Sequence, residues 1–482
     1  MARDRMTRRR FLAKAAAAAA GLGVLGLGAQ CGPTPTPQII EKVVEKEVTK
    51  IVERVVEREV PLPMVGERKL VRFLSSPWIL DQVPTDKMAR AYNEMQEEVE
   101  VRPESLGATT WAGADWMAKL VKQQQENKLE WCGQMVMFPF MHLVARCKMG
   151  FHVPLEDLFA ASKVEGAATL LDDLLPVLKE DASYQGHVYG VPYSYEVEMW
   201  TYRKDWFADV GYEEPPKTWE ELWDACDEVK KKFGKDNPDF YPYGWANSLY
   251  AAYQPWIHTA TDKPYTEEGL VDFTGEGLPA LDFMKRMVEA GLGPAAGADA
   301  ASHYDLGFKE LIASFCEDNS RAPMMAKSME GGFEKWATGR MAMRDPEKDS
   351  GSFFYGSCWT VLGKAPYPQE MADFYAWCYG PANTSMQQAI IESGKTPVYQ
   401  SVYDTLLKDP KNWFYAEFML AGLELMKTSI PYPSNNYWLI QDGAATKYLQ
   451  TFLEKGSGQE AEEVAKKIMD EIKVEIAKLE VK

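Results

Sequence analysis

The segment from residue 69 to 126 alternates between two hydrophobic patterns, and this alternation restricts the fold more than any other feature. Residues 69–74 and 98–102 show the two-residue periodicity of strands, whereas residues 85–98 and 111–126 show the periodicity of helices. A strand-helix-strand-helix order indicates a parallel sheet covered by helices, because the crossover helix packs back onto the sheet. The pattern therefore predicts an α/β fold.

A second set of strand and helix signals follows further along the chain. Short strands are expected at residues 188–192 and 199–202, and the next helix begins with the capping-box pair Thr218 and Glu221. Near the C-terminus, apolar residues spaced three or four apart in 464–479 define an amphipathic closing helix. Two α/β lobes in one chain are therefore expected.

The N-terminal segment has the order of an export signal. The twin arginines Arg8 and Arg9 are followed by Phe11, Leu12 and a mildly apolar stretch over residues 15–28. This Ala- and Gly-rich stretch is too short to span a bilayer of about 30 Å. We expect the first 30 residues to be a twin-arginine signal peptide.

The segment after the expected signal has the features of a membrane anchor and tether. Residues 27–31 resemble a lipobox, in which the thiol of Cys31 is acylated, although Gln30 departs from the small residue usual before the cysteine. A Gly-Pro-Thr-Pro-Thr-Pro tether follows. Residues 41–60 are charged and β-branched, and their heptad-like spacing over about two heptads leaves a coiled coil or a partly ordered stalk open. We expect a lipid-anchored protein outside the cytoplasm, at the cell surface or in the periplasm.

Composition excludes several classes of partner and site. The 482-residue chain has a formal net charge of −18, which disfavours nucleic acid and anionic membrane surfaces, since both bind clustered Lys and Arg. With five scattered histidines and no C-x-x-C pair among seven cysteines, no zinc site and no cofactor is expected. The cysteines after the lipobox are either buried thiols or disulfides, for which Cys132 with Cys147 and Cys358 with Cys378 are the nearest pairs.

The most specific pattern lies between residues 184 and 222. It consists of Tyr184-Gln185-Gly186-His187-Val188-Tyr189-Gly190-Val191-Pro192, then Trp200-Thr201-Tyr202-Arg203-Lys204-Asp205-Trp206-Phe207, then Pro215-Pro216-Lys217-Thr218-Trp219. In order and spacing this pattern resembles the extracellular solute-binding protein family 1, the maltose-binding-protein-like group. Weaker resemblance covers most of residues 67–478. The family's G-x-P-D is replaced at 127–134, and the Trp usual near 320–329 is missing, which argues against a ligand similar to maltodextrin.

The resemblance implies a two-lobed periplasmic-binding-protein clamp, with each lobe a mostly parallel sheet flanked by helices. It implies a protein without enzymatic activity that captures a solute, expected to be a mono- or oligosaccharide, in an interlobe cleft at the carboxyl ends of strands. The solute is then delivered to an ABC import permease. The expected segments are 1–30 as signal peptide, 31–66 as anchor tether and stalk, 67–194 as the first part of lobe 1, 195–308 as the first part of lobe 2, 309–365 as the return to lobe 1, and 366–482 as the C-terminal helices of lobe 2.

Candidate ligand contacts in the first lobe are chosen by residue type and position, because carboxylates and amides bind sugar hydroxyls and aromatic rings stack on sugar faces. Ser76 and Trp78 follow the first strand, where the resemblance places ligand contacts, with a buried turn as the alternative. Phe138 aligns with a stacking aromatic of the family or packs in the core. Glu196, at the expected lobe crossing, accepts hydrogen bonds from hydroxyls or forms a surface salt bridge.

The densest aromatic cluster, residues 241–256, supplies the candidates of the second lobe. Trp245, Asn247 and Tyr253 are expected to stack on the ligand or to bind it through the amide. Trp359 and Tyr437 are further candidates in two other aromatic stretches.

Alternative functions remain open at this level. The same clamp can hold a polyol, an organic acid or a phosphorylated solute, and Arg321 and Lys327 could support an anion. A secreted hydrolase is the alternative of another class, although no G-x-S-x-G, H-E-x-x-H or P-loop motif is present.

Overall fold

The structure is a computed structural model of the 482-residue chain. It describes residues 64–75, 85–105, 114–126, 128–138, 143–245, 249–295, 306–307, 309–329, 332–347, 351–433 and 437–480. The folded unit comprises Arg58–Lys478. The expected signal peptide, the lipid site Cys31 and the stalk at 41–60 lie outside the described residues. Among the described helices, none is long and apolar enough to cross a membrane.

Ten strands of the described chain form one sheet, and two more form a separate hairpin. The strands are β1 Met64–Val65, β2 Arg68–Ser75, β3 Val99–Ser105, β4 Gly133–Phe138, β5 Ser183–Tyr184, β6 His187–Val188, β7 Gly190–Arg203, β8 Tyr241–Gly244, β9 Ile312–Asp318, β10 Trp336–Gly339, β11 Phe353–Val361 and β12 Ile430–Pro431. Along the sheet the order is β1-β2-β4-β11-β7-β9-β8, with β3 beside β2, β10 beside β7 and β12 beside β11.

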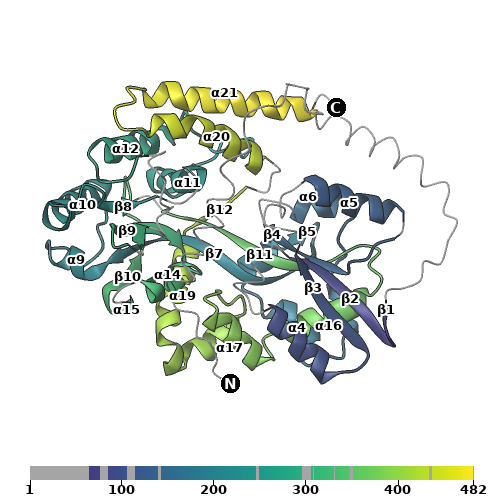
Figure 1. Ribbon diagram of the computed structural model, residues 1–482. Coiled ribbons are helices and arrows are strands. Elements are labelled where there is room, and N and C mark those ends of the chain that lie inside the picture. The colour runs from purple at the N-terminus through teal and green to yellow at the C-terminus, as the bar shows by residue number, and fades with distance from the viewer. Residues whose placement is uncertain are drawn as a thin grey trace, which may run out of the picture. The chain divides into compact units, whose positions relative to one another are not determined.

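Strand β7 joins two halves of this sheet (Figure 1). Residues 190–197 of β7 pair with β11, which in turn pairs with β4. Residues 198–203 pair instead with β9 and β10. We call β1–β4, β11 and the start of β7 the first half, and β8–β10 with the end of β7 the second half.

The single strand β7 corrects the prediction of two short strands at 188–192 and 199–202. Its burial pattern explains the error, since every residue except Glu198 is buried along all 14 positions. The polar residues Ser194, Glu196 and Glu198 interrupt the apolar pattern in sequence but do not interrupt the strand.

The α/β class is confirmed, but the sheet is mixed rather than mostly parallel in each lobe. Parallel ladders join β2 to β3, β2 to β4, β8 to β9 and β11 to β12. The ladders that involve β7, and the ladder between β11 and β4, are antiparallel. The antiparallel strands arise because β7 and β11 run through the sheet between the strand-helix-strand units rather than as members of them.

Helices cover both faces of each half, as a helix-flanked sheet requires. They are α4 Thr85–Met95, α5 Ala114–Gln125, α6 Leu143–Lys148, α7 Glu156–Ala161, α8 Pro176–Asp181, α9 Lys204–Ala208, α10 Trp219–Phe233, α11 Leu249–Ala260, α12 Leu278–Glu289, α14 Ala322–Ser328, α15 Gly332–Lys335, α16 Pro368–Tyr379, α17 Thr384–Glu392, α18 Gln400–Asp404, α19 Trp413–Met426, α20 Trp438–Phe452 and α21 Ala461–Glu480, with short 3₁₀ turns at Ala167–Asp172, Leu406–Lys408 and Pro410–Asn412. In Figure 1, α5 and α6 lie on one face of the first half, and α4 and α16 lie on the other.

Several helix predictions are confirmed. The predicted helices at 85–98 and 111–126 correspond to α4 and α5, and the closing helix corresponds to α21. At the start of α10, the Thr218 side chain accepts a bond from the Glu221 amide while the Glu221 carboxylate accepts one from the Thr218 amide. The capping box therefore forms as the sequence pattern predicts.

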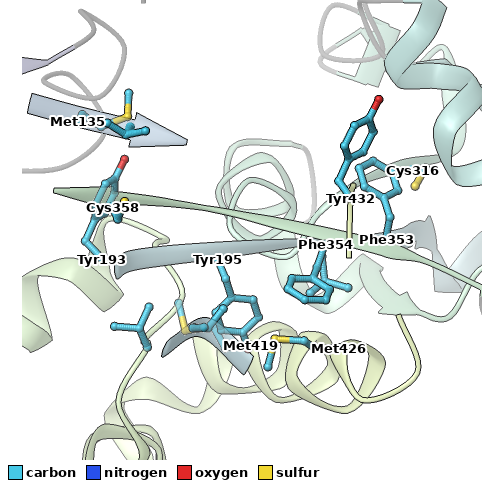
Figure 2. Close-up of a cluster of buried hydrophobic side chains, with 14 of the residues drawn as sticks. Met135, Tyr193, Tyr195, Cys316, Phe353, Phe354, Cys358, Met419, Met426 and Tyr432 are labelled. Carbon is cyan, nitrogen blue, oxygen red and sulfur yellow. The ribbon is translucent and has the colours of Figure 1, made fainter. Parts of the chain in front are cut away.

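The hydrophobic core continues across the place where β7 and β11 connect the two halves (Figure 2). Tyr195 of β7 and Phe354 of β11 point toward α19, where Met419 and Met426 lie. The Tyr195 and Tyr403 hydroxyls are 2.6 Å apart, so this buried ring also fixes α18 against β7. The six described cysteines are free and buried, which leaves the two possible disulfides unformed.

We predict that Trp359→Ala destabilises the protein by about 3–5 kcal/mol, because Trp359 is fully buried and its ring lies 5.2 Å from those of Phe73 and Tyr193. The matched control is Trp413→Ala, since Trp413 is 59% exposed and its loss is expected to change stability by less than about 0.5 kcal/mol. Urea unfolding of the purified variants measures both effects. Equal midpoints for the two variants would contradict the core assignment of Trp359.

Candidate functional site

The carboxyl ends of strands from both halves meet at one place on β7 and β11 (Figure 1). Phe138, the last residue of β4, is paired with Gly356, and Asp318, the last residue of β9, is paired with Glu198. Between them, Tyr355 of β11 is paired with Glu196 of β7. We call residues 196–198 and 354–356 the strand junction. In open α/β sheets this edge, beyond the carboxyl ends of the strands, is where ligands bind.

Side chains alternate between the two faces of β7, and this alternation gathers polar groups on one face. Tyr195 and Val197 are buried in the hydrophobic core, so Ser194, Glu196 and Glu198 share the opposite face. The carboxylates at 196 and 198 are therefore neighbours along one face of the strand.

Glu196 is a buried carboxylate with a specific cationic partner. Its residue surface is 3% exposed, and its Oε1 lies 3.5 Å from Lys395 Nζ and accepts a 3.0 Å bond from Ser194 Oγ. Burial raises the pKa of this carboxyl, while the nearby Lys395 ammonium opposes that shift. The second oxygen, Oε2, is buried and receives no hydrogen bond from the described residues.

The turn between β9 and α14 brings further charge to the junction. Asp318 Oδ1 accepts bonds from the Ser320 amide at 2.9 Å, the Ser320 hydroxyl at 2.5 Å and the Arg321 amide at 2.9 Å. Arg321 lies between two carboxylates, 3.3 Å from Asp318 Oδ2 and 3.6 Å from Glu317 Oε1. Lys395 Nζ donates to Ser320 Oγ at 3.3 Å and so connects this turn to Glu196.

Glu198 is the one carboxylate of this group without a close cation in the described chain. Its recorded donor is the thiol of Cys316, with Sγ 3.5 Å from Oε2, and a thiol is a weak donor. Burial, followed by the negative charges of Glu317 and Asp318, holds the pKa of the Glu198 carboxyl well above its usual range. Unlike Glu196, Glu198 is partly exposed.

Asn319 holds the β9–α14 turn against β7. Its amide donates to the Val197 carbonyl at 3.0 Å, and its side-chain Oδ1 accepts a 2.8 Å bond from the Val197 amide. Helix α19 approaches this side chain so closely that a Cβ at Gly422 would lie 2.3 Å from Asn319 Nδ2. A glycine at 422 is therefore required for α19 to support the turn.

Of the residues predicted from the sequence, the structure brings Glu196 to the junction together with the backbone of Phe138. Ser76, Trp78 and Asn247 lie outside the described residues. In the sequence, Ser76 follows the last residue of β2, as predicted, and Asn247 comes three residues after the end of β8. Their contact with a solute stays a prediction.

Three predicted aromatic residues have partners in the hydrophobic core. Trp245 is 6% exposed and donates from Nε1 to the Pro294 carbonyl at 2.7 Å. Tyr253 is fully buried, stacks on Phe273 and donates to a backbone carbonyl. Trp359 is likewise fully buried. These contacts account for the three rings without a ligand, and ligand contact by them stays a prediction.

Tyr437 stands apart from these three rings. It precedes α20 at the edge of a gap in the described chain, and it is partly exposed. Its role in ligand binding also stays a prediction.

A hollow of about 490 Å³ lies elsewhere, on the first half near Gly166 and Ala382. Its polar groups already bind one another, since Asp173 accepts bonds from Ser401 and Asp172 pairs with Lys179 at 3.1 Å. The strand junction, with buried charges and a carboxylate oxygen that receives no bond from the described chain, is the stronger candidate.

Sequence reasoning missed most of the charged residues at the junction. Glu198 stands two residues after Glu196, so strand alternation could have placed it on the same face. Asp318 and Lys395 had no such signal, because they reach Glu196 from segments more than 100 residues away in sequence. Arg321, considered for its charge alone, pairs with Glu317 and Asp318.

Comparison with protein families gives an assignment that agrees with this geometry. Residues 87–417 match the model of the bacterial extracellular solute-binding protein family. The chain belongs to this family. The resemblance predicted from residues 184–222 is thereby confirmed, and the family's name places its members outside the cytoplasm.

Solved structures show the same fold at low sequence identity. UgpB from Mycobacterium tuberculosis in complex with glycerophosphocholine has a TM-score of 0.67 and 16% identity, over 85% of this chain and 98% of that one. The sugar-binding protein MalE from Xanthomonas citri has a TM-score of 0.65 and 16% identity, over 86% and 100%. An ABC substrate-binding protein from Listeria monocytogenes in complex with cycloalternan has a TM-score of 0.65 and 14% identity, over 85% and 99%. The predicted two-lobed clamp is confirmed as the fold of this group.

We predict that Glu198→Gln makes the protein more stable at neutral pH and has little effect at low pH. Because the pKa of Glu198 is raised in the folded state, the folded chain keeps a proton that the unfolded chain loses at an ordinary carboxyl pKa of about 4.3. The contribution of Glu198 to the free energy of unfolding is therefore greatest below about pH 4.3 and falls as the pH rises toward the folded pKa. A glutamine at 198 does not titrate, so this fall is absent in the variant.

Melting temperatures between pH 4 and pH 8 measure the effect. The difference between Glu198→Gln and the wild type should increase with pH, whereas Glu220→Gln, at an exposed position on α10, should give a constant difference. Parallel curves for Glu198→Gln and the wild type would show that this carboxyl titrates normally.

Proposed function

We propose that this protein binds a solute at the strand junction and delivers it to the permease of an ABC importer. The observation that carries the proposal is the convergence of β4 and β9, one from each half, on residues 196–198 and 354–356. A solute at this place contacts both halves at once, which is how a two-lobed binding protein captures its ligand.

The polar groups at the junction suit a hydroxylated solute. Glu196 Oε2 is a buried acceptor that receives no bond from the described chain, and a sugar hydroxyl supplies the missing donor. Structures with this fold have been solved with cycloalternan, maltose and α-D-tagatose. These neighbours support a mono- or oligosaccharide as the solute, with a polyol, organic acid or phosphorylated solute as the alternatives.

The remaining predicted contacts complete the proposed site. Ser76 and Trp78 after β2, Phe138 at the end of β4 and Asn247 after β8 would surround the solute from the carboxyl ends of the strands. Tyr437, before α20, is proposed as a further contact. Solute binding needs no bond to be made or broken, so we propose that the protein is not an enzyme and holds no cofactor.

The N-terminal sequence supports attachment of this protein to the membrane. We propose that Arg8 and Arg9 direct export, that Cys31 carries the lipid, and that residues 31–66 hold the binding unit away from the membrane surface. We also propose lobe boundaries at residues 195, 309 and 366, of which the first lies within β7.

We predict that one solute from a panel of sugars, polyols, organic acids and phosphorylated sugars raises the melting temperature and is recovered chemically unchanged. A ligand at 100 times its Kd adds about 2.7 kcal/mol to the free energy of unfolding. Glu196→Gln should weaken binding of that solute about tenfold, because a charge-assisted hydrogen bond contributes about 1.5–3 kcal/mol.

A double variant separates binding from folding. Glu196→Gln alone removes the carboxylate that lies 3.5 Å from the buried Lys395 ammonium and should lower the melting temperature, while Glu196→Gln with Lys395→Met removes both charges of this pair and should restore it. The double variant should still bind weakly. Wild-type affinity in the double variant would remove Glu196 from the site, and a hydrolysed or oxidised solute would contradict the transport function.

Export is tested separately from solute binding. Replacing Arg8 and Arg9 by Lys should retain the protein in the cytoplasm, since the guanidinium pair is recognised by geometry as well as charge. Cys31→Ser should abolish metabolic labelling with a fatty acid while leaving export intact. Normal export of the Lys variant, or persistent labelling of the Ser variant, would contradict these assignments.

A further inference from the structure

Carboxyl groups outnumber cationic groups at the strand junction among the described residues. Four carboxylates, those of Glu196, Glu198, Glu317 and Asp318, are grouped with two cations in the described chain, Lys395 and Arg321. Lys395 lies against Glu196, and Arg321 lies against Glu317 and Asp318. Both cations therefore lie against other carboxylates, and Glu198 is the carboxyl group left without an ion pair among the described residues.

We propose that the Glu198 carboxyl group selects a hydroxylated solute that carries an ammonium or similar organic cation, and that the junction rejects anionic solutes. The inference rests on the proposed function, because it assigns the charge of the solute that the same site binds. Within the group of four carboxyl groups, Glu198 is the one that pairs with the cation of the solute.

The hydrogen-bonding capacity of the group points to a donor-rich ligand. Ionised carboxylates only accept, and Glu196 Oε2 is buried without a hydrogen bond from the described chain, whereas Asp318 Oδ2 is already 3.3 Å from Arg321 Nε. Glu196 and Asp318 are 3% and 0% exposed, so solvent cannot take the place of a donor readily. An ammonium carries three donors and no acceptor, and a sugar hydroxyl adds one more, which matches an acceptor-only surface.

The exposure of Glu198 separates it from the rest of the group. Glu196, Glu317 and Asp318 are buried, whereas Glu198 on the same face is partly exposed. The titratable and charged groups near enough to influence it are Glu317, Asp318, Arg321 and Cys316 from the β9–α14 segment, together with Tyr355 from β11. An incoming cation can therefore reach Glu198 without displacing Lys395 or Arg321.

A metal ion is a poorer occupant than an organic cation. No three His, Cys, Asp or Glu side chains among the described residues are arranged to hold a metal. Tyr355, paired with Glu196 across the two strands, places an aromatic ring stacked on Phe353 beside the carboxyl groups, and aromatic rings attract organic cations. Burial raises the pKa of its hydroxyl, so the ring stays neutral.

The test compares solutes that share a carbon skeleton and carry a neutral, a cationic or an anionic substituent. Binding to the full chain is measured by calorimetry for D-glucose, D-glucosamine and glucose 6-phosphate, and for glycerol, 2-amino-1,3-propanediol and glycerol 3-phosphate. We expect the amine of at least one series to bind ten times more tightly than its neutral parent, and neither phosphate to bind. An ammonium that pairs with Glu198 displaces its proton, so titrations in phosphate and MOPS buffers should show proton release on binding.

Glu198→Gln should reduce the preference for the amine to less than about twofold, and Glu220→Gln should leave it unchanged. Equal affinity for the neutral and aminated solutes would overturn this inference, and so would tight binding of a phosphate. Either result leaves the proposed function unaffected. Failure of both amines to bind would overturn it as well, while the broader solute panel decides the proposed function independently. If Glu198→Gln does not fold, the preference and proton release of the wild type decide the question.

Discussion

The pairing of one long strand with both halves of the sheet is the constraint on which the other features depend. Because residues 190–197 of β7 bond to β11 and residues 198–203 bond to β9 and β10, the two halves share a backbone rather than a flexible linker. The alternation of side chains along β7 then divides its residues between two environments. Tyr195 and Val197 enter the core, and Glu196 and Glu198 must face the other way. The register of β7 therefore determines both which of its side chains enter the core and which carboxyl groups lie on the opposite face.

Buried charges at the strand junction reduce the free energy of unfolding unless they are paired. A buried ion pair gains Coulomb energy but loses the hydration of both ions, and replacing such a pair by apolar residues is often neutral or stabilising. The pair between Glu196 and Lys395 is therefore poorly explained as a device for stability. The carboxyl group of Glu198 opposes folding at neutral pH, because its charged form is disfavoured by burial and by two like charges. Local costs of this kind concentrate at functional sites, where the missing partner is the ligand.

The sequence predicted the fold in those segments where local pattern and tertiary structure agree. The capping box at Thr218 depends on residues three apart, so no distant contact was needed to predict it. Strand β7 was divided wrongly because its polar side chains have partners far away in sequence, Lys395 for Glu196 and Cys316 for Glu198. The same reason explains why most charged residues of the site were not predicted from the sequence. Residue type and family position found Glu196, but the partners from β9, the β9–α14 turn and the segment after α17 come together only when the chain is folded.

Aromatic residues show the limit of composition as a guide. Rings suited to a sugar face are equally suited to a core, and Trp245 and Tyr253 both have the hydrogen-bond partners that buried aromatic residues require. Type and clustering could not separate the two roles, since both give the same pattern along the chain. A carboxylate carries more information, because each of its buried oxygens needs a donor, and Glu196 Oε2 receives none from the described residues, which points to a ligand. At the strand junction this argument favours Glu196 and Glu198 over every ring nearby. It also makes the charge of the solute, rather than the shape of its rings, the property that this site is built to detect.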